Sequence, residues 1–125
     1  MRLEARTLRV AGALLLAIGT IVGAFGAHAL KTRLAPDRYE VLQTAVHYQF
    51  VNALGLLLVG IVAERIAAPL LRTAGALLLF GVLLFSGSLY LILAGAPTWL
   101  GVVTPLGGLS LIAGWLLAAW AMAKG

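Results

Sequence analysis

The amino-acid sequence predicts an all-α integral membrane protein, a four-helix bundle that forms one domain over residues 1–125. Three observations support this fold class. Hydrophobic residues make up 62% of the chain and charged residues only 10%, whereas soluble domains carry about 25% charged residues. A chain of 125 residues is too short to bury so much apolar surface in a core of its own. Residues 73–123 hold no charged side chain, which is enough for two membrane crossings of about 20 residues each.

The first span is predicted over residues 8–30, where a long apolar run follows three arginines. On a helix, Gly19, Gly23 and Gly26 fall within about 60° of one another. The first two form a small-xxx-small pair, which lets two membrane helices pack closely. His28 lies nine residues after Gly19, so on a regular helix it points away from the glycines. We expect a glycine packing face, with His28 near the non-cytoplasmic surface as the best single candidate for a functional residue.

The end of this run also fits a signal-peptide cleavage site, because Ala27-His28-Ala29 has the small-x-small pattern. The apolar run is longer, however, than the usual signal core of about 7–15 residues. Its glycines also share one helix face, which a discarded peptide would not need. We therefore expect the stretch to be retained in the protein.

The second span is predicted over residues 45–63, inside a longer helix that begins at Pro36. Proline suits the first helical position, and the negative charge of Asp37 suits the start of a helix. A helix from Pro36 to Ala63 is longer than a bilayer crossing. Its first turns should therefore form an amphipathic start at the membrane surface.

Two polar faces are expected on this second helix. Gln49 and Asn52 share a face with small residues, a pattern typical of a helix–helix seam in which amides select the partner. His47 shares a second face with Gln43 and Glu40, which we expect to hold the imidazole by hydrogen bonds.

The long uncharged segment should break at LAGAPTWLGVVTPLGG, which leaves spans over residues 72–94 and 104–123. Glycines and prolines interrupt the helical pattern there, and Trp99 suits a membrane interface. Thr104 and Pro105 fit the N-cap and the first helical position of the last span.

In the third span, Ser86 and Tyr90 are four residues apart and share one face. Gly81, Ser88 and Gly95 recur every seven residues on another face. Such a heptad of small residues predicts a helix–helix seam.

The fourth span carries Gly107 and Gly114 together with further small residues on one face, so it too should pack closely against a neighbour. Trp115 lies deeper in the span and is expected to be a packing residue. Trp120 lies near the end and is expected at an interface.

The distribution of Lys and Arg favours an orientation with both termini in the cytoplasm, because basic loops are retained there. The side with the termini and the second loop holds Arg2, Arg6, Arg9, Arg65, Arg72 and Lys124, and the other side holds Lys31, Arg33 and Arg38. No basic run with interleaved aromatics occurs, so we expect no nucleic-acid partner.

Four stretches of the chain occur together in a characteristic order: GAFGAHALKTRL with Pro36 after it, TAVHYQFVNALGLLLVG, LLFSGSLYL and WLGVVTPLGGLSLIAGWLL. In this order they resemble the bacterial members of the transmembrane protein 256 family, also called domain of unknown function 423 or uncharacterised protein family 0382. The resemblance implies a small inner-membrane protein with four helices and no established activity. The family typically has a histidine where this chain has Asn52. An amide cannot titrate near neutral pH, so this position suits a hydrogen-bonding seam better than a proton relay.

No motif of a known catalytic site occurs in the sequence. It contains no cysteine, and no HExxH, P-loop or GxSxG pattern. Its four acids lie in loops or near the ends of the spans, whereas a proton-coupled transporter usually buries an acid in mid-span. We expect no enzyme activity, no metal site and no cofactor.

Three functional hypotheses follow. The first is a structural or accessory bundle that packs with itself, as a homo-oligomer, or with a larger membrane complex. The second is an oligomeric conduit for a small molecule, lipid or ion, and it rests on the polar side chains inside the spans. Those side chains are Gln49, Asn52, Ser86 and Tyr90, with His28 as a further candidate. The third is binding of anionic lipids by the three basic residues of the first loop region.

Overall fold

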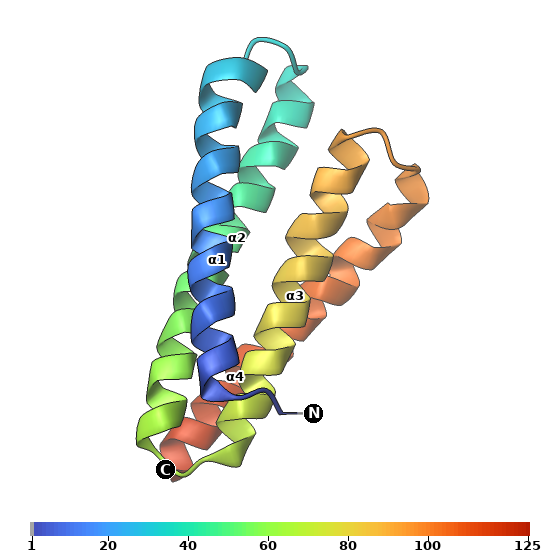
Figure 1. Ribbon diagram of the computed structural model, residues 1–125. Helices are drawn as coiled ribbons and strands as arrows, with labels where there is room; N and C mark the ends of the chain where they lie inside the picture. The colour runs from blue at the N-terminus through green and yellow to red at the C-terminus, as the bar shows by residue number, and fades with distance from the viewer. Residues whose placement is uncertain (1) are drawn as a thin grey trace.

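The computed structural model describes residues 2–125 and contains four long helices (Figure 1). They are α1 (Ala5–Phe25), α2 (Pro36–Arg65), α3 (Pro69–Leu93) and α4 (Val103–Lys124). A π-helical turn, η1 (Gly26–Leu30), continues α1, and a 3₁₀ turn, η2 (Thr98–Val102), precedes α4. Each of the four helices is long and apolar enough to cross a membrane. No strand occurs within residues 2–125, so the expected all-α membrane fold is confirmed.

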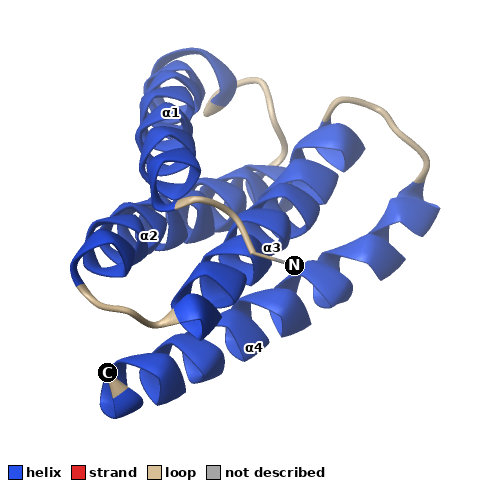
Figure 2. Ribbon diagram, turned by 60° about the horizontal axis from the view of Figure 1, so that its bottom comes forward, coloured by secondary structure: helices blue, strands red, loops and turns tan. Residues whose placement is uncertain are grey.

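The helices run alternately up and down (Figure 1). Both ends of the described chain and the α2–α3 turn lie at one end of the bundle, which we call the terminal end. The α1–α2 and α3–α4 connections lie at the opposite end. α1 packs mainly on α2, α4 packs mainly on α3, and α2 and α3 join the two pairs. Figure 2 shows α1 and α4 on opposite sides of the central helices, so the bundle is open rather than closed around one axis.

The predicted start of the second helix at Pro36 is confirmed. The helix begins at Pro36 and carries Asp37 in its first turn. Its 30 residues extend over about 45 Å, against roughly 30 Å for the hydrocarbon layer, so its ends reach the headgroups. Arg38 in this start donates a hydrogen bond of 3.0 Å to the carbonyl oxygen of Leu93. Arg38, one of the three basic residues of the first loop region, therefore has a hydrogen-bonding partner within the chain.

The apolar core joins α1, α2, α3 and α4. Leu8, Leu56, Leu71, Leu78 and Ala118 are fully buried in it. In lipid, such contacts stabilise a bundle through van der Waals packing rather than through exclusion of water. Tight fit between side chains and backbone is therefore the main requirement on this core.

Glycines provide that fit where helices approach most closely. A Cβ atom at Gly12 of α1 would lie 2.9 Å from the backbone nitrogen of Leu57 in α2. A Cβ atom at Gly107 of α4 would overlap the backbone of Phe85 in α3. A side chain at either position would have to push two backbones apart.

The glycine face predicted on α1 is turned toward α2. A Cβ atom at Gly19, Gly23 or Gly26 would lie between 2.8 and 3.5 Å from an α2 side chain. The three neighbours, in order, are Gln49, Val46 and Leu42. On the α3–α4 contact, Gly81 and Gly114 make similar approaches to Leu111 and Leu78.

Two local predictions are wrong. α4 begins at Val103, directly after the 3₁₀ turn, so Thr104 is inside the helix and does not cap it. Its hydroxyl instead lies 2.6 Å from that of Ser88. Gly95 lies beyond the end of α3 with a φ of 106°, and a Cβ there would meet nothing within 4 Å. Positive φ favours glycine and ends a helix, so Gly95 is a turn residue and not part of the seam.

Replacement of Gly107 by alanine should destabilise the bundle, because the new methyl group overlaps the backbone of Phe85. Overpacking of this kind costs about 1–3 kcal/mol. The free energy of unfolding of the purified protein in detergent, followed by circular dichroism, measures the loss.

Gly108→Ala is the matched control on the neighbouring residue. Its Cβ would lie 3.8 Å from the Phe85 ring, an ordinary contact, and alanine is the better helix former, so the free energy of unfolding should not fall. Equal losses at the two positions would contradict the close approach of α3 and α4.

Candidate functional site

Polar side chains from several helices meet around the middle of α2, where Gln49 is 2% exposed. Its Nε2 atom donates to the carbonyl oxygen of Leu15 in α1, at 2.8 Å. Its Oε1 atom accepts from the hydroxyl of Tyr90 in α3, at 2.6 Å. Because a carbonyl only accepts, the amide nitrogen has to face Leu15. One side chain thus joins α1, α2 and α3.

Ser86 adds a second link between α3 and α2. Its hydroxyl is buried and donates to the carbonyl oxygen of Ala45, at 2.8 Å. A carbonyl oxygen has two lone pairs, so Ala45 can accept this bond and still take part in the helical ladder of α2. Ser86 and Tyr90, which lie one turn apart, therefore both contact α2.

Asn52 ties α2 to α4. Its Oδ1 atom accepts from the indole N–H of Trp115, at 2.8 Å, and its Nδ2 atom donates to the carbonyl oxygen of Tyr48, at 2.9 Å. The Trp115 ring lies directly over Gly55, where any Cβ atom would overlap it. An asparagine both donates and accepts here, as this position requires.

The opposite face of α3 contacts α4 through small and hydroxylated residues. The hydroxyls of Ser88 and Thr104 lie 2.6 Å apart. Ser110 of α4 donates to the carbonyl oxygen of Leu77, at 2.7 Å. Gly81 lies against α4 in the same contact. The two polar faces of α3 thus serve two different neighbours.

His47 lies outside these contacts. Its imidazole is exposed and forms no hydrogen bond with any described residue. The expectation that Gln43 would hold it is wrong, because the Gln43 amide donates instead to the Tyr39 hydroxyl, at 2.6 Å. Tyr39 lies one turn before Gln43, and His47 lies one turn after it. The Gln43 amide donates to the phenol oxygen of Tyr39 and not to the imidazole of His47.

His47 lines a groove between α2 and α4, with α3 as its floor. The cavity measures about 560 Å³, within the range typical of ligand pockets. Aromatic and aliphatic side chains line it. His47 meets Tyr48 edge to face with ring centres 5.7 Å apart, and Tyr48 packs on Phe85 at 4.7 Å. Asn52 and Trp115 also line it. The groove therefore combines an apolar surface with one free imidazole.

His28 lies in the π-helical turn that follows α1. The N–H of Lys31 donates to the carbonyl oxygen of Gly26, five residues back, at 3.0 Å. This wider turn changes the direction of its side chains, so the direction expected for His28 on a regular helix does not apply. The imidazole is exposed and has no hydrogen-bonding partner within residues 2–125. No cluster of three metal-ligating side chains occurs in the part of the chain that is described.

Two features of the site were not predicted from the sequence: Trp115 as a hydrogen-bond donor and the aromatic rings that line the groove. A signal for Trp115 was present, because an indole N–H inside a bundle usually finds an acceptor and α2 carries two amides, Gln49 and Asn52, within its span. The backbone acceptors Leu15 and Ala45 carry no signal of their own, since every residue has a carbonyl group.

Comparison with known proteins gives consistent results. Residues 22–108 match the family model described as a protein of unknown function, DUF423. The chain is 42% identical over 112 residues to the UPF0382 membrane protein YwdK of Bacillus subtilis. This alignment covers 88% of this chain and 89% of that protein. It is 41% identical over 108 residues to the UPF0382 membrane protein SH2409 of Staphylococcus haemolyticus, covering 86% and 88% respectively.

A more distant relative is the UPF0382 inner membrane protein YgdD of Escherichia coli. It is 37% identical over 97 residues, which cover 77% of this chain and 73% of that protein. No solved structure matches the chain significantly. The family expected from the four sequence stretches is confirmed.

The link between Gln49 and Tyr90 should be measurable as a coupling energy. In a double-mutant cycle with Tyr90→Phe and Gln49→Leu, we expect a coupling between about 0.6 and about 1.7 kcal/mol, the average and the maximum measured for hydrogen bonds inside a membrane bundle. Unfolding in detergent supplies the four free energies.

Tyr48→Phe is the control, since the same hydroxyl is removed from a tyrosine whose oxygen has no hydrogen bond to a described residue. It should change stability by less than about 0.5 kcal/mol and show no coupling to Gln49→Leu. A zero coupling for the Tyr90 pair would refute the hydrogen-bonded link.

Proposed function

Since this chain belongs to the DUF423 family of uncharacterised membrane proteins, we propose that it is a structural or accessory bundle of the bacterial inner membrane. It packs with itself or with a larger membrane complex and catalyses no reaction. The relative in Escherichia coli that is named an inner membrane protein supports this location, as do the four helices of spanning length.

One observation carries the proposal: the polar side chains inside the helices hydrogen-bond to one another and to the backbone. Gln49, Ser86 and Asn52 are all buried and all partnered. A conduit needs polar groups that face an open path and can exchange partners with the solute. These groups instead close the contacts between helices, which favours the structural role over the conduit.

The positions of the acidic residues also favour the structural role. Asp37 and Glu40 lie in the surface start of α2, and Glu4 and Glu64 lie at the terminal end. All four are exposed, and Glu64 pairs with Arg9 at 2.7 Å. A proton carrier or a general acid within the membrane would need an ionisable group at depth, and these carboxylates lie outside it.

The groove between α2 and α4 is the surface that best supports a protein partner. His47 lies near the middle of α2, and an imidazole without a partner in the hydrocarbon layer is unfavourable. A neighbouring helix seated in the groove would cover the aromatic rings and supply a hydrogen-bonding group. The open arrangement of the helices leaves room for such a neighbour.

Native mass spectrometry of the protein, extracted in mild detergent or lipid discs, tests this association. We expect a multiple of the 13.0 kDa chain or a complex with other membrane proteins. Ile112→Trp should abolish the association, because Ile112 lines the groove and an indole would fill it.

Leu14→Trp is the control. Leu14 is exposed on α1, which lies on the opposite side of the central helices from α4, so this substitution should leave the association intact. A wild-type chain that is always a lone monomer would overturn the proposal. Ion or amphiphile flux through reconstituted vesicles, lost in His28→Ala, would establish the conduit instead.

We also propose that both termini lie in the cytoplasm. The terminal end carries Arg2, Arg6, Arg9, Arg65, Arg72 and Lys124, and this excess of basic residues supports the orientation. The chain has no cysteine, so single cysteines can report the orientation directly. In intact cells, a membrane-impermeant maleimide should label Thr32→Cys in the α1–α2 connection and spare Ala67→Cys in the α2–α3 turn. The reverse pattern would show the opposite orientation.

A further inference from the structure

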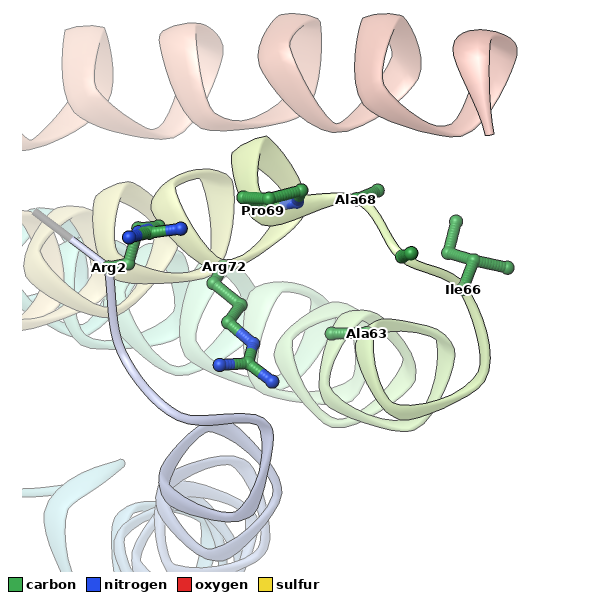
Figure 3. Close-up of a pocket in the computed structure, with 7 residues that line it drawn as sticks. Arg2, Ala63, Ile66, Ala68, Pro69 and Arg72 are labelled. Carbon is green, nitrogen blue, oxygen red and sulfur yellow. The ribbon is translucent and has the colours of Figure 1, made fainter.

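A second hollow lies at the terminal end, away from the polar centre of the bundle. It is formed by the end of α2, the α2–α3 turn, the start of α3 and the segment before α1, and measures about 300 Å³. Its lining residues are Arg2, Ala63, Ile66, Ala67, Ala68, Pro69 and Arg72. Figure 3 shows Arg72 extending from α3 toward the end of α2 near Ala63, with Arg2 beside the first turns of α3.

The charge in this hollow is of one sign. Arg2 and Arg72 both line it, and no acidic side chain does. Within residues 2–125 the only ion pair joins Arg9 to Glu64, and neither Arg2 nor Arg72 donates a hydrogen bond to a described residue. Each guanidinium group carries five N–H donors, so the hollow holds two cations with free donors.

The remaining walls are apolar and small. Besides the two arginines, the lining side chains are the aliphatic Ala63, Ile66, Ala67, Ala68 and Pro69, and the small alanines leave the space between them open. The hollow thus presents positive charge together with an apolar surface. A ligand that fits both has an anionic group attached to a hydrocarbon portion.

The position of the hollow selects among such ligands. α3 has 25 residues and extends over about 37 Å, longer than the hydrocarbon layer. Arg72 lies in its first turn, so the hollow is at the level of the lipid headgroups. A phosphate there is bound by arginine through paired, charge-assisted hydrogen bonds, and basic hollows between helices at this level suit anionic headgroups.

We propose that Arg2 and Arg72 bind the anionic headgroup of a phospholipid, with its glycerol portion resting on the apolar wall formed by Ala67 and Pro69. The site is independent of the structural role proposed above, because it lies at a different surface of the bundle. It gives this chain a specific lipid ligand in the leaflet next to its termini.

The test uses the full chain in lipid discs of phosphatidylcholine that contain a small fraction of phosphatidylglycerol. After gentle transfer to detergent, mass spectrometry measures how much phosphatidylglycerol each protein retains. The double variant Arg2→Gln with Arg72→Gln should retain about tenfold less than the wild type. The matched control, Arg6→Gln with Arg65→Gln, removes the same charge from the same end outside the hollow and should retain wild-type amounts.

A second variant keeps both arginines. Ala67→Glu places a carboxylate in the hollow, where it should pair with the guanidinium groups and displace the phospholipid to a similar extent. Circular dichroism confirms that each variant is folded. Equal retention by the hollow variants and the wild type, or equal losses in the hollow and control variants, would overturn the proposal.

Inorganic phosphate distinguishes a lipid from a free anion. Added at millimolar concentration, it should leave the retained phosphatidylglycerol unchanged, because it lacks the hydrocarbon portion that contacts the apolar wall. Complete displacement by inorganic phosphate would assign the hollow to free phosphate and refute the lipid ligand.

Discussion

The bundle depends on one constraint of the lipid environment, namely that polar atoms buried between its helices need partners within the protein. Gln49 meets the constraint by joining Leu15 and Tyr90, and Asn52 meets it by accepting from Trp115. These bonds need backbones that approach closely, which the glycines allow. Gly19 lies directly against Gln49, so the polar contact of Gln49 with α1 depends on the close packing that this glycine allows.

Much of the fold was predictable because it depends on local chemistry. The start of α2 at Pro36 follows from proline and acid preferences at helix N-termini. The glycine face of α1 follows from helical periodicity alone. The start of α4 and the π-helical turn at His28 were not predictable, because both depend on how the chain turns at a helix end, where several backbone geometries are close in energy.

The sequence predicts which residues form the candidate site, but not which of them hydrogen-bond to one another. Helical periodicity separates Ser86 from Ser88 on two faces of α3, and the structure directs these faces to α2 and α4. Periodicity cannot supply the rotation and height of one helix against the next, and these decide that Gln49 meets Tyr90. They also place His47 on the groove between α2 and α4.

The pairing of Gln49 has a consequence for the order in which the chain assembles during synthesis. Its bond to Leu15 lies within the first helical hairpin and can form as soon as α1 and α2 have entered the membrane. The Oε1 atom of Gln49 and the Oδ1 atom of Asn52 accept from Tyr90 and Trp115, which belong to the second hairpin. These two bonds can form only after that hairpin has entered the membrane. The first hairpin alone therefore lacks the partners of these two amide oxygens, and docking of the second hairpin supplies them.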